Sequence, residues 1–250
     1  IILLADNQNL PEESFSGRHN MVGQIALVGG DEFRTGCQSM DKLILQSTGT
    51  CHPKVLIVPT AAAEQNPYKA ASKGKSYFNN LGAETGTLLV LDREKAGDPT
   101  FISRIGEADL IYFTGGDPEL LLNVLTGSKL FEAVKHAIAG GTVLAGSSAG
   151  AMVLGSWMNY QGWKSGLGLL ENISIFPHHE KSDPRKVSAQ LAESLPRGVT
   201  ALGIDAGVAC LGIGQDWKVV GNGSVILYAD GTWDRYHTGE SIPVTTEIQT

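Results

Sequence analysis

Short apolar segments recur along the first 150 residues, and each of them ends near Gly, Pro, Asp or Ser. They cover residues 23–30, 54–60, 86–92, 108–116 and 141–147. Nearly continuous apolar runs of this length are typical of strands that are buried on both faces, as in a parallel sheet. The sequence therefore indicates a sheet that is covered on both sides.

Amphipathic segments separate these apolar runs. We expect helices over residues 36–47, 64–81, 118–125 and 129–139. Alternation of strands and helices in this order predicts βαβ units and hence a doubly wound α/β sheet. Ligands of such sheets bind beyond the carboxyl ends of the strands, so the residues that follow each run are the first candidates for a functional site.

The C-terminal third contains more closely spaced apolar segments, over residues 199–205, 207–214, 217–221 and 224–231. Asn222-Gly223 lies between the last two and is a strong signal for a tight hairpin, and Asp230-Gly231 marks another turn. These segments predict an antiparallel extension of the same sheet. We expect one α/β domain over residues 21–250, and we interpret residues 1–20 as an N-terminal arm or a cloning remnant.

The composition excludes several classes of protein. Hydrophobic residues make up 42% and charged residues 18% of the 250 residues, which allows a sizeable core and excludes global disorder. The net charge of −7 argues against a nucleic-acid partner, because such proteins usually carry a basic patch. No apolar run approaches the roughly 20 residues of a membrane span, so we expect no membrane partner.

The cysteines and the spacing of metal-ligand residue types argue against a cofactor. Cys37, Cys51 and Cys210 form no metal-ligand spacing, and a small odd number of cysteines is typical of reduced thiols in an intracellular protein. The sequence also lacks an HExxH motif. We expect a cytoplasmic location, no metal and no cofactor.

A glycine-flanked serine lies between an apolar run and a helical segment, in Gly146-Ser147-Ser148-Ala149-Gly150. This is G-x-S-x-G in the strand–turn–helix context of a nucleophile elbow. Small residues on both sides leave room for the sharp turn, and the N–H of Ala149 points to where an oxyanion would form. We predict Ser148 as the nucleophile. Because the motif is short, a glycine-rich turn or an anion-binding loop is the alternative.

A second glycine pair ends another apolar run, in Thr114-Gly115-Gly116-Asp117. The N–H of Gly116 is our candidate for the second oxyanion donor. The alternative is a plain strand–helix turn, in which Asp117 caps the helix and Pro118 is its first residue. Both interpretations can hold together.

Two of the six histidines follow the serine at a suitable place. His178 and His179 come directly after the short strand-like run 173–177. A base that follows the serine in the chain is the order found in hydrolases with a nucleophile elbow. For each histidine alone, a role in a surface loop is the alternative.

Four segments then suggest a family. TGGDPELLL, AGSSAGAMVLG, a Pro-His pair and ALGIDAG follow one another in the chain. Together they resemble the serine peptidases that include cyanophycinase and aspartyl dipeptidase (peptidase E), from about Gly23 to about Asp230. The resemblance implies a flavodoxin-like α/β fold, related to class I glutamine amidotransferases, and peptide hydrolysis by a serine and a histidine.

The resemblance also assigns roles. It places Ser148 on the nucleophile, His178 on the base, and Gly116 and Ala149 on the oxyanion-hole positions.

Three further residues are expected to contact substrate. The resemblance places Arg185 on an arginine that binds a substrate carboxylate. His179 fills a position that many relatives give to an aromatic residue. Asp117, next to the expected oxyanion hole, completes the set.

The chain departs from the family at one position. Relatives commonly have a glutamate where Ala206 stands, and that glutamate orients the histidine. Loss of such an acid can lower the rate by about 10⁴-fold. We prefer Asp205 as the replacement, with Glu180 and Asp183 as alternatives. Adjacent residues on a strand point to opposite faces, which counts against Asp205 unless the backbone turns there.

We interpret the chain as a serine peptidase that hydrolyses small peptides through an acyl-enzyme, as an exopeptidase, a dipeptidase or a cyanophycinase-like enzyme. Ala206 favours a first alternative, a catalytically weakened or non-catalytic binding protein on the same scaffold. The second alternative is an amidase or glutaminase-like hydrolase, although the usual nucleophile there is cysteine. The expected partner is a peptide substrate, and because relatives include dimers we also consider a homodimer.

Overall fold

The structure is a computed structural model that describes residues 22–249. Its centre is an eight-stranded sheet with the order β14-β11-β10-β1-β5-β4-β2-β3. The neighbouring strands from β1 to β3 in this order are all parallel. These strands are β1 (Ile25–Val28), β5 (Val143–Ser147), β4 (Leu110–Phe113), β2 (Lys54–Val58) and β3 (Glu84–Thr87).

Antiparallel strands extend this sheet beyond β1. They are β10 (Val208–Ile213), β11 (Asp216–Gly221) and β14 (Ser241–Ile242). The expected mostly parallel sheet with antiparallel C-terminal strands is therefore confirmed.

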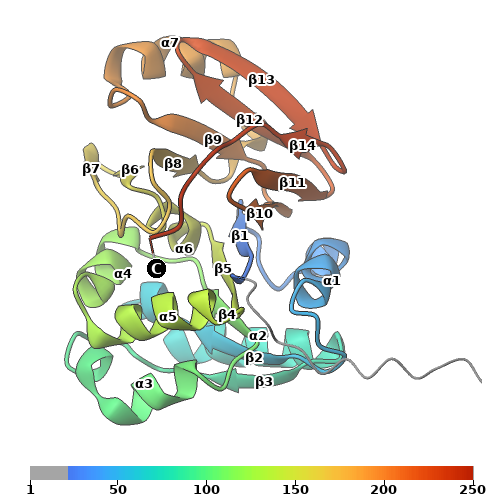
Figure 1. The fold of residues 1–250 in the computed structure, drawn as a ribbon, viewed down its shortest axis with the longest axis vertical. Coiled ribbons are helices and arrows are strands. Elements are labelled where there is room, and N and C mark those ends of the chain that lie inside the picture. Colours follow the sequence, from blue (N-terminus) through green and yellow to red (C-terminus); the bar gives the residue numbers. More distant parts are fainter. Residues whose placement is uncertain (1–21, 250) are drawn as a thin grey trace, which may run out of the picture.

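Helices cover both faces of the sheet (Figure 1). One face packs against α3 (Pro99–Ile105), α4 (Pro118–Leu125) and α5 (Lys129–Ala139), and the other against α1 (Gln38–Gln46) and α2 (Pro67–Asn80). Ile25 and Leu27 of β1 belong to the first core, whereas Ala26 and Val28 belong to the second. Successive side chains of a strand point to opposite faces, so two buried faces require the continuous apolar runs that the sequence contains.

The remaining strands form a second sheet, which lies at the top of the view in Figure 1. Its order is β13-β12-β9-β8, and α7 (Pro184–Ser194) packs against it through Leu191. Its strands are β13 (Thr232–His237), β12 (Ser224–Ala229), β9 (Thr200–Ile204) and β8 (Ile173–Phe176). A separate hairpin consists of β6 (Trp157–Asn159) and β7 (Trp163–Ser165), and the short helix α6 (Ala149–Met152) follows β5.

Two expectations about the C-terminal third are wrong. The segments 199–205 and 224–231 do not extend the central sheet, because β9 and β12 belong to the second sheet. Asn222-Gly223 does not close a hairpin, because β11 pairs with β10 and β14 while β12 pairs with β9 and β13. The chain changes sheets at this point instead. Gly221 allows the change: it has φ +110°, and a Cβ on it would lie 2.5 Å from the carbonyl oxygen of Gly207. Asp230-Gly231 does close a hairpin, between β12 and β13.

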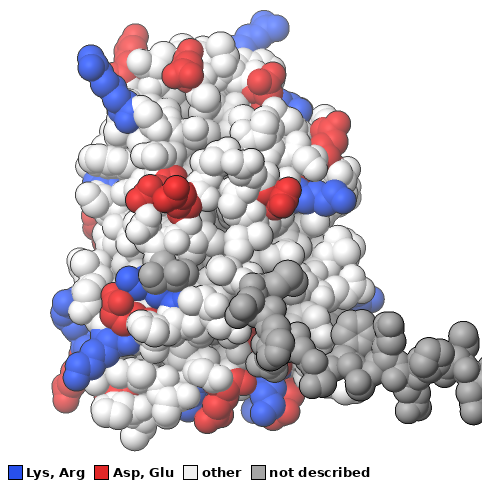
Figure 2. Space-filling view, viewed as in Figure 1, with Lys and Arg blue, Asp and Glu red and all other residues white. Residues whose placement is uncertain are grey.

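Several expectations concern the surface and the ends of the chain. Among residues 22–249, no helix has the length and apolar character that crossing a membrane requires. Basic and acidic side chains are interspersed on the face drawn in Figure 2. Cys37, Cys51 and Cys210 are all free thiols. The proposed arm, residues 1–20, lies outside the described residues, and the single-domain interpretation stays a prediction.

A buried acid lies on the inner face of α1. Asp41 has no exposed surface, and its Oδ2 accepts a hydrogen bond of 2.7 Å from the hydroxyl of Tyr77. Its Oδ1 has no hydrogen-bond partner within the described part of the chain. Because burial disfavours the charged form, it raises the pKa of Asp41 to about 7.

Stability should therefore depend on pH through Asp41. An unfolded aspartate loses its proton near pH 4, roughly, whereas folded Asp41 keeps it to about pH 7. The free energy of unfolding should fall by about 1.4 kcal/mol per pH unit across this window. Asp41→Asn, which still accepts from Tyr77, should lack this slope. Urea unfolding of both proteins between pH 5 and pH 8 checks this, and parallel pH curves would contradict it.

Candidate active site

The predicted nucleophile lies on a strained turn. β5 ends at Ser147 and α6 begins at Ala149, and Ser148 between them has φ 49° and ψ −111°. Such a conformation is costly for a residue with a side chain and is found mostly at functional sites. The N–H of Ser148 donates to the carbonyl oxygen of Val28 on the neighbouring strand, at 3.0 Å. The segment therefore has the geometry of a nucleophile elbow.

The flanking glycines are required by space. A Cβ on Gly146 would lie 2.4 Å from the carbonyl oxygen of Gly150. A Cβ on Gly150 would lie 2.5 Å from the carbonyl oxygen of Phe113. No larger residue fits at either position without moving backbone, which explains the G-x-S-x-G spacing in physical terms.

The structure brings His178 to Ser148. His178 follows β8 in a left-handed conformation (φ 53°, ψ 45°), and its backbone N–H donates to Gly29 at 2.8 Å. Its Nε2 lies 3.2 Å from Oγ of Ser148. The imidazole ring packs on Gly30, where a Cβ would come within 2.2 Å of Cε1 of the ring. The pair is thus within the distance over which a base can take the hydroxyl proton.

Two backbone N–H groups remain free near this pair. Gly116 has φ +143°, and a Cβ on it would lie 2.1 Å from the carbonyl oxygen of Ala61. The next N–H, that of Asp117, donates to the same oxygen at 2.7 Å. Within residues 22–249, the N–H groups of Gly116 and Ala149 donate no hydrogen bond. Both are therefore available to an anionic oxygen.

The preferred orienting acid is not at the histidine. Asp205 is buried, and its Oδ2 accepts hydrogen bonds from the N–H and the hydroxyl of Ser224, at 2.9 and 2.8 Å. Asp183 caps α7 by accepting from the N–H of Arg185 at 3.0 Å. Neither carboxylate is hydrogen-bonded to His178 in the part of the chain that the structure describes.

Glu180 is close enough to His178 for their charges to interact, although no hydrogen bond joins the two side chains within the described residues. Its Oε2 accepts a hydrogen bond of 3.0 Å from the N–H of Ala206. This bond and the nearby charge of His178 lower the pKa of Glu180. The carboxylate therefore reaches the loop of Ala206, where the resemblance leads us to expect a glutamate.

The three expected substrate contacts lie elsewhere. His179 is buried, and its Nε2 lies 2.6 Å from the hydroxyl of Tyr228; burial lowers the pKa of His179. Asp117 caps α4, accepting from the N–H groups of Glu119 and Leu120. Arg185 is exposed on α7. None of the three lines the cavity at Ser148.

A cleft of about 430 Å³ opens at Ser148 and His178. The loop after β1 contributes Glu32 and Arg34 to its wall, and α2 contributes Lys69 and Lys73. Sequence reasoning missed these residues. The one sequence signal that could have identified them as cleft residues is their position after the carboxyl ends of the parallel strands β1 and β2.

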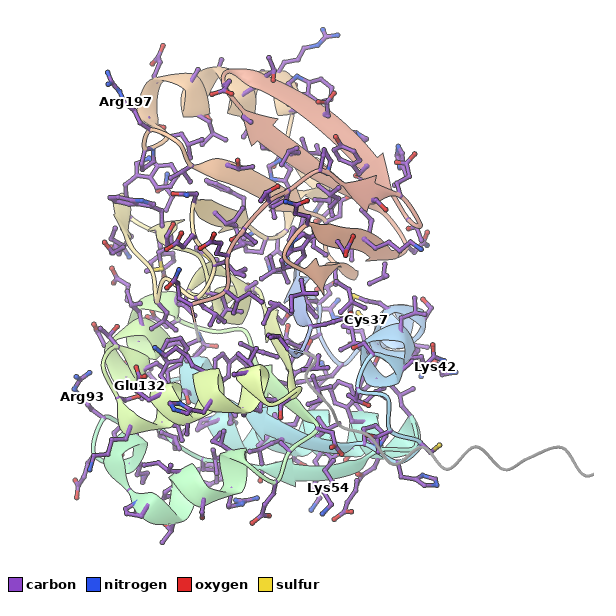
Figure 3. All side chains as sticks on the ribbon, viewed as in Figure 1. Cys37, Lys42, Lys54, Arg93, Glu132 and Arg197 are labelled. Carbon is purple, nitrogen blue, oxygen red and sulfur yellow. The ribbon has the colours of Figure 1, made fainter. Side chains whose placement is uncertain are left out.

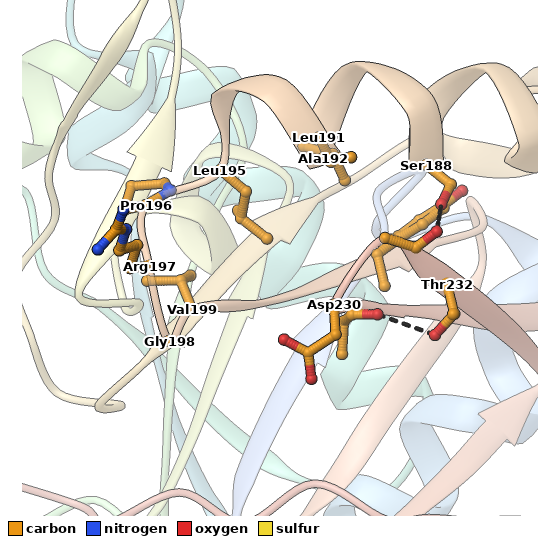
Figure 4. Close-up of a pocket in the computed structure, with 13 residues that line it drawn as sticks. Ser188, Leu191, Ala192, Leu195, Pro196, Arg197, Gly198, Val199, Asp230 and Thr232 are labelled. Carbon is orange, nitrogen blue, oxygen red and sulfur yellow. Dashed lines mark hydrogen bonds between the residues drawn. The ribbon is translucent and has the colours of Figure 1, made fainter.

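A second cavity, of about 290 Å³, lies between α7 and the β12–β13 turn (Figure 4). Leu191 and Leu195 line it, and Ser188 at its edge donates to the carbonyl oxygen of Gly231 at 3.0 Å. None of the predicted catalytic residues contributes to it. Residues 22–249 also contain no cluster of His, Cys, Asp or Glu that could hold a metal ion, and the expectation of no cofactor stays a prediction.

Comparison with known proteins identifies a family that matches most of the chain. The sequence model of peptidase family S51 matches residues 25–220. The chain is similar to the cyanophycinase of Trichormus variabilis, with 25% identity over 232 residues, which cover 86% of this chain and 76% of that protein. It is also similar to the cyanophycinase of Synechococcus elongatus, with 27% identity over 225 residues, or 82% and 67% of the two chains.

A solved structure supports the same relationship. The crystal structure of a peptidase from an acI-B1 Actinobacterium superposes with a TM-score of 0.79 at 29% identity. The match covers 90% of this chain and 98% of that one.

Proposed function

The chain belongs to peptidase family S51, and from this membership and the geometry of the site we propose that it is a serine peptidase that works through an acyl-enzyme. The observation that carries the proposal is the 3.2 Å separation of His178 Nε2 and Ser148 Oγ on a strained elbow. A serine becomes a nucleophile only when a base stands within reach of its proton.

The proposed reaction has two halves. His178 takes the proton of Ser148 while Oγ attacks the peptide carbonyl, and the N–H groups of Gly116 and Ala149 receive the oxyanion. His178 then gives the proton to the leaving amine, the C–N bond breaks, and an ester on Ser148 remains. Water attacks this ester as His178 takes its proton. His178 then gives that proton to Oγ of Ser148, the ester C–O bond breaks, the carboxylic acid leaves and the serine is restored.

We assign the supporting acid to Glu180 in place of Asp205. An acid next to the histidine stabilises the imidazolium that forms in each half of the reaction. Glu180 has the charge interaction with His178 and a fixed position through Ala206. Asp205 is committed to Ser224.

The proposed substrates are small peptides or peptide ends. The cleft of about 430 Å³ is small, and the relatives include cyanophycinases. Cleavage as an exopeptidase, as a dipeptidase or in a cyanophycinase-like manner fits such a cleft. A cytoplasmic location and a homodimer stay predictions.

A non-catalytic binding protein is the second candidate. Ala206 favours it, because the family's usual acid is missing at that position. Glu180 argues against it, since a carboxylate has reached the same loop from another direction.

The test of the proposed function is covalent labelling of the native chain. A fluorophosphonate should phosphonylate Ser148 in the folded protein, with loss of fluoride, and leave the heat-denatured protein unlabelled, as judged by mass spectrometry of its peptides. A peptide library read by mass spectrometry should then identify which bond is cut. A folded chain that is neither labelled nor active on any peptide would establish the binding protein instead.

A further inference from the structure

A carboxylate that the proposed reaction does not use lies beside the nucleophile. Glu32 follows β1 and is half-buried in the wall of the cleft. Its Oε1 accepts a hydrogen bond of 2.9 Å from the N–H of Gly115. Its Oε2 accepts one of 2.9 Å from the hydroxyl of Ser147. Bonds to a carboxylate are stronger than bonds between neutral groups.

The two partners of Glu32 stand at the ends of neighbouring parallel strands, β4 and β5. Gly115 directly precedes the oxyanion donor Gly116, and Ser147 directly precedes the nucleophile. One carboxylate thus connects the strand end that carries the donor with the strand end that carries the serine. The carboxylate of Glu32 and the side chain of Ser148 lie on the same side of Gly115. A Cβ on Gly115 would lie 3.0 Å from Oε1 of Glu32 and 3.3 Å from Cβ of Ser148.

The orientation of the Gly116 peptide depends on this bond. On its C-terminal side, the N–H of Asp117 is bound to Ala61. On its N-terminal side, the N–H of Gly115 is bound to Glu32. The N–H of Gly116 lies between these two fixed groups and is left for the oxyanion. Without Glu32, Gly115 would lose its acceptor, and one of the two constraints on the segment would disappear.

The loop that carries Glu32 is strained, and the packing of Phe33 stabilises it. Asp31 and Phe33, its two neighbours, both have φ 61°, a left-handed conformation that costs free energy in residues with side chains. Phe33 is buried against an aromatic cluster, with its ring centroid 5.2 Å from that of Tyr112 and 5.8 Å from that of Tyr77. This packing stabilises a loop conformation that places Glu32 at the two strand ends.

We propose that Glu32 is a positioning residue that holds the oxyanion donor and the nucleophile elbow at a fixed separation. The inference rests on the proposed function. Glu32 has no hydrogen bond to Oγ of Ser148 or to His178 among the described residues, so it acts through Gly115 and Ser147 and not on the substrate.

The test compares two substitutions of Glu32. Glu32→Ala should slow phosphonylation of Ser148 by the fluorophosphonate and lower kcat for a cleaved peptide by about 10²-fold, with KM nearly unchanged, because misplacement of the reacting groups acts on the chemical step. Glu32→Gln should restore most of the rate, since its amide oxygen can accept from Gly115 and its amide N–H can donate to Ser147. Glu132→Gln, on the outer surface of α5 (Figure 3), is the matched control and should react as the wild type does.

An NMR measurement distinguishes failure of this inference from failure of the proposed function. The Gly115 amide proton, observed by NMR, should shift upfield and exchange faster in Glu32→Ala than in the wild type. Labelling at the wild-type rate in Glu32→Ala, or a Gln variant as slow as the Ala variant, would overturn the positioning role. If the wild type itself is not labelled, the proposed function fails, whereas an unchanged Gly115 resonance in Glu32→Ala would show that Glu32 does not hold the segment.

Discussion

Ser148→Ala should abolish fluorophosphonate labelling and lower kcat/KM for peptide hydrolysis by about 10⁶-fold. The expected loss is large because the variant removes the atom that forms the acyl-enzyme, while the proposed donors, the N–H groups of Gly116 and Ala149, stay in place. Residual hydrolysis would come from the oxyanion site and substrate binding alone. Labelling measured by mass spectrometry and single-turnover kinetics on the best library peptide check this result.

The neighbouring serine provides the control for this substitution. Ser147 is buried and its hydroxyl donates to Glu32, so Ser147→Ala should still be labelled at Ser148, at a reduced rate. If labelling survives in Ser148→Ala and disappears in Ser147→Ala, then Ser147 is the nucleophile and the assignment to Ser148 is wrong.

The parallel sheet could be predicted from the sequence because its cause is local. The strands β1, β2, β4 and β5 are mostly buried on both faces, so their apolar runs are continuous and recognisable. The edge strand β3 is polar and only partly buried. The elbow was predictable because its cause is also local. A Cβ on Gly146 or Gly150 would clash with backbone atoms, so both positions require glycine. The helix α3 was missed, because a seven-residue helix gives little periodic signal.

The second sheet could not be predicted in the same way. Asn222-Gly223 is a hairpin signal only if the strands on both sides pair with each other. Here the pairing of β11 with β10 and of β12 with β9 decides the topology, and these pairings depend on the whole core. The local signal from Asp230-Gly231 was reliable because its two strands do pair.

The supporting groups of the site were the least predictable. Glu32 contacts Gly115 and Ser147, which lie 83 and 115 residues further along the chain. Glu180 reaches Ala206 across 26 residues. Asp205 directly precedes Ala206 in the sequence, but its side chain binds Ser224 in the second sheet. Nothing in the spacing of such residues indicates which carboxylate a folded loop will bring to the histidine.

Loss of the base should be nearly as severe as loss of the nucleophile. His178→Gly is expected to lower kcat by about 10⁶-fold, and the double variant with Ser148→Ala should be no worse than either single variant, because the two residues act as one unit. The glycine suits the left-handed backbone at this position (φ 53°). The substitution also removes the imidazole ring that packs on Gly30, and so leaves space for a free imidazole. Added imidazole should therefore restore part of the activity of His178→Gly and none of the activity of Ser148→Ala.

The two candidate acids, Glu180 and Asp205, make the same prediction more specific. If Glu180 stabilises the imidazolium, Glu180→Gln should lower kcat because it removes the negative charge. Imidazole rescue of His178→Gly should also weaken when Glu180→Gln is added. Asp205→Asn should lower the free energy of unfolding through Ser224 and leave the rescue intact, because its carboxylate faces the second sheet. The reverse pattern, with rescue lost in Asp205→Asn and kept in Glu180→Gln, would return the orienting role to Asp205. Absence of rescue in every background would mean that His178 is not the base.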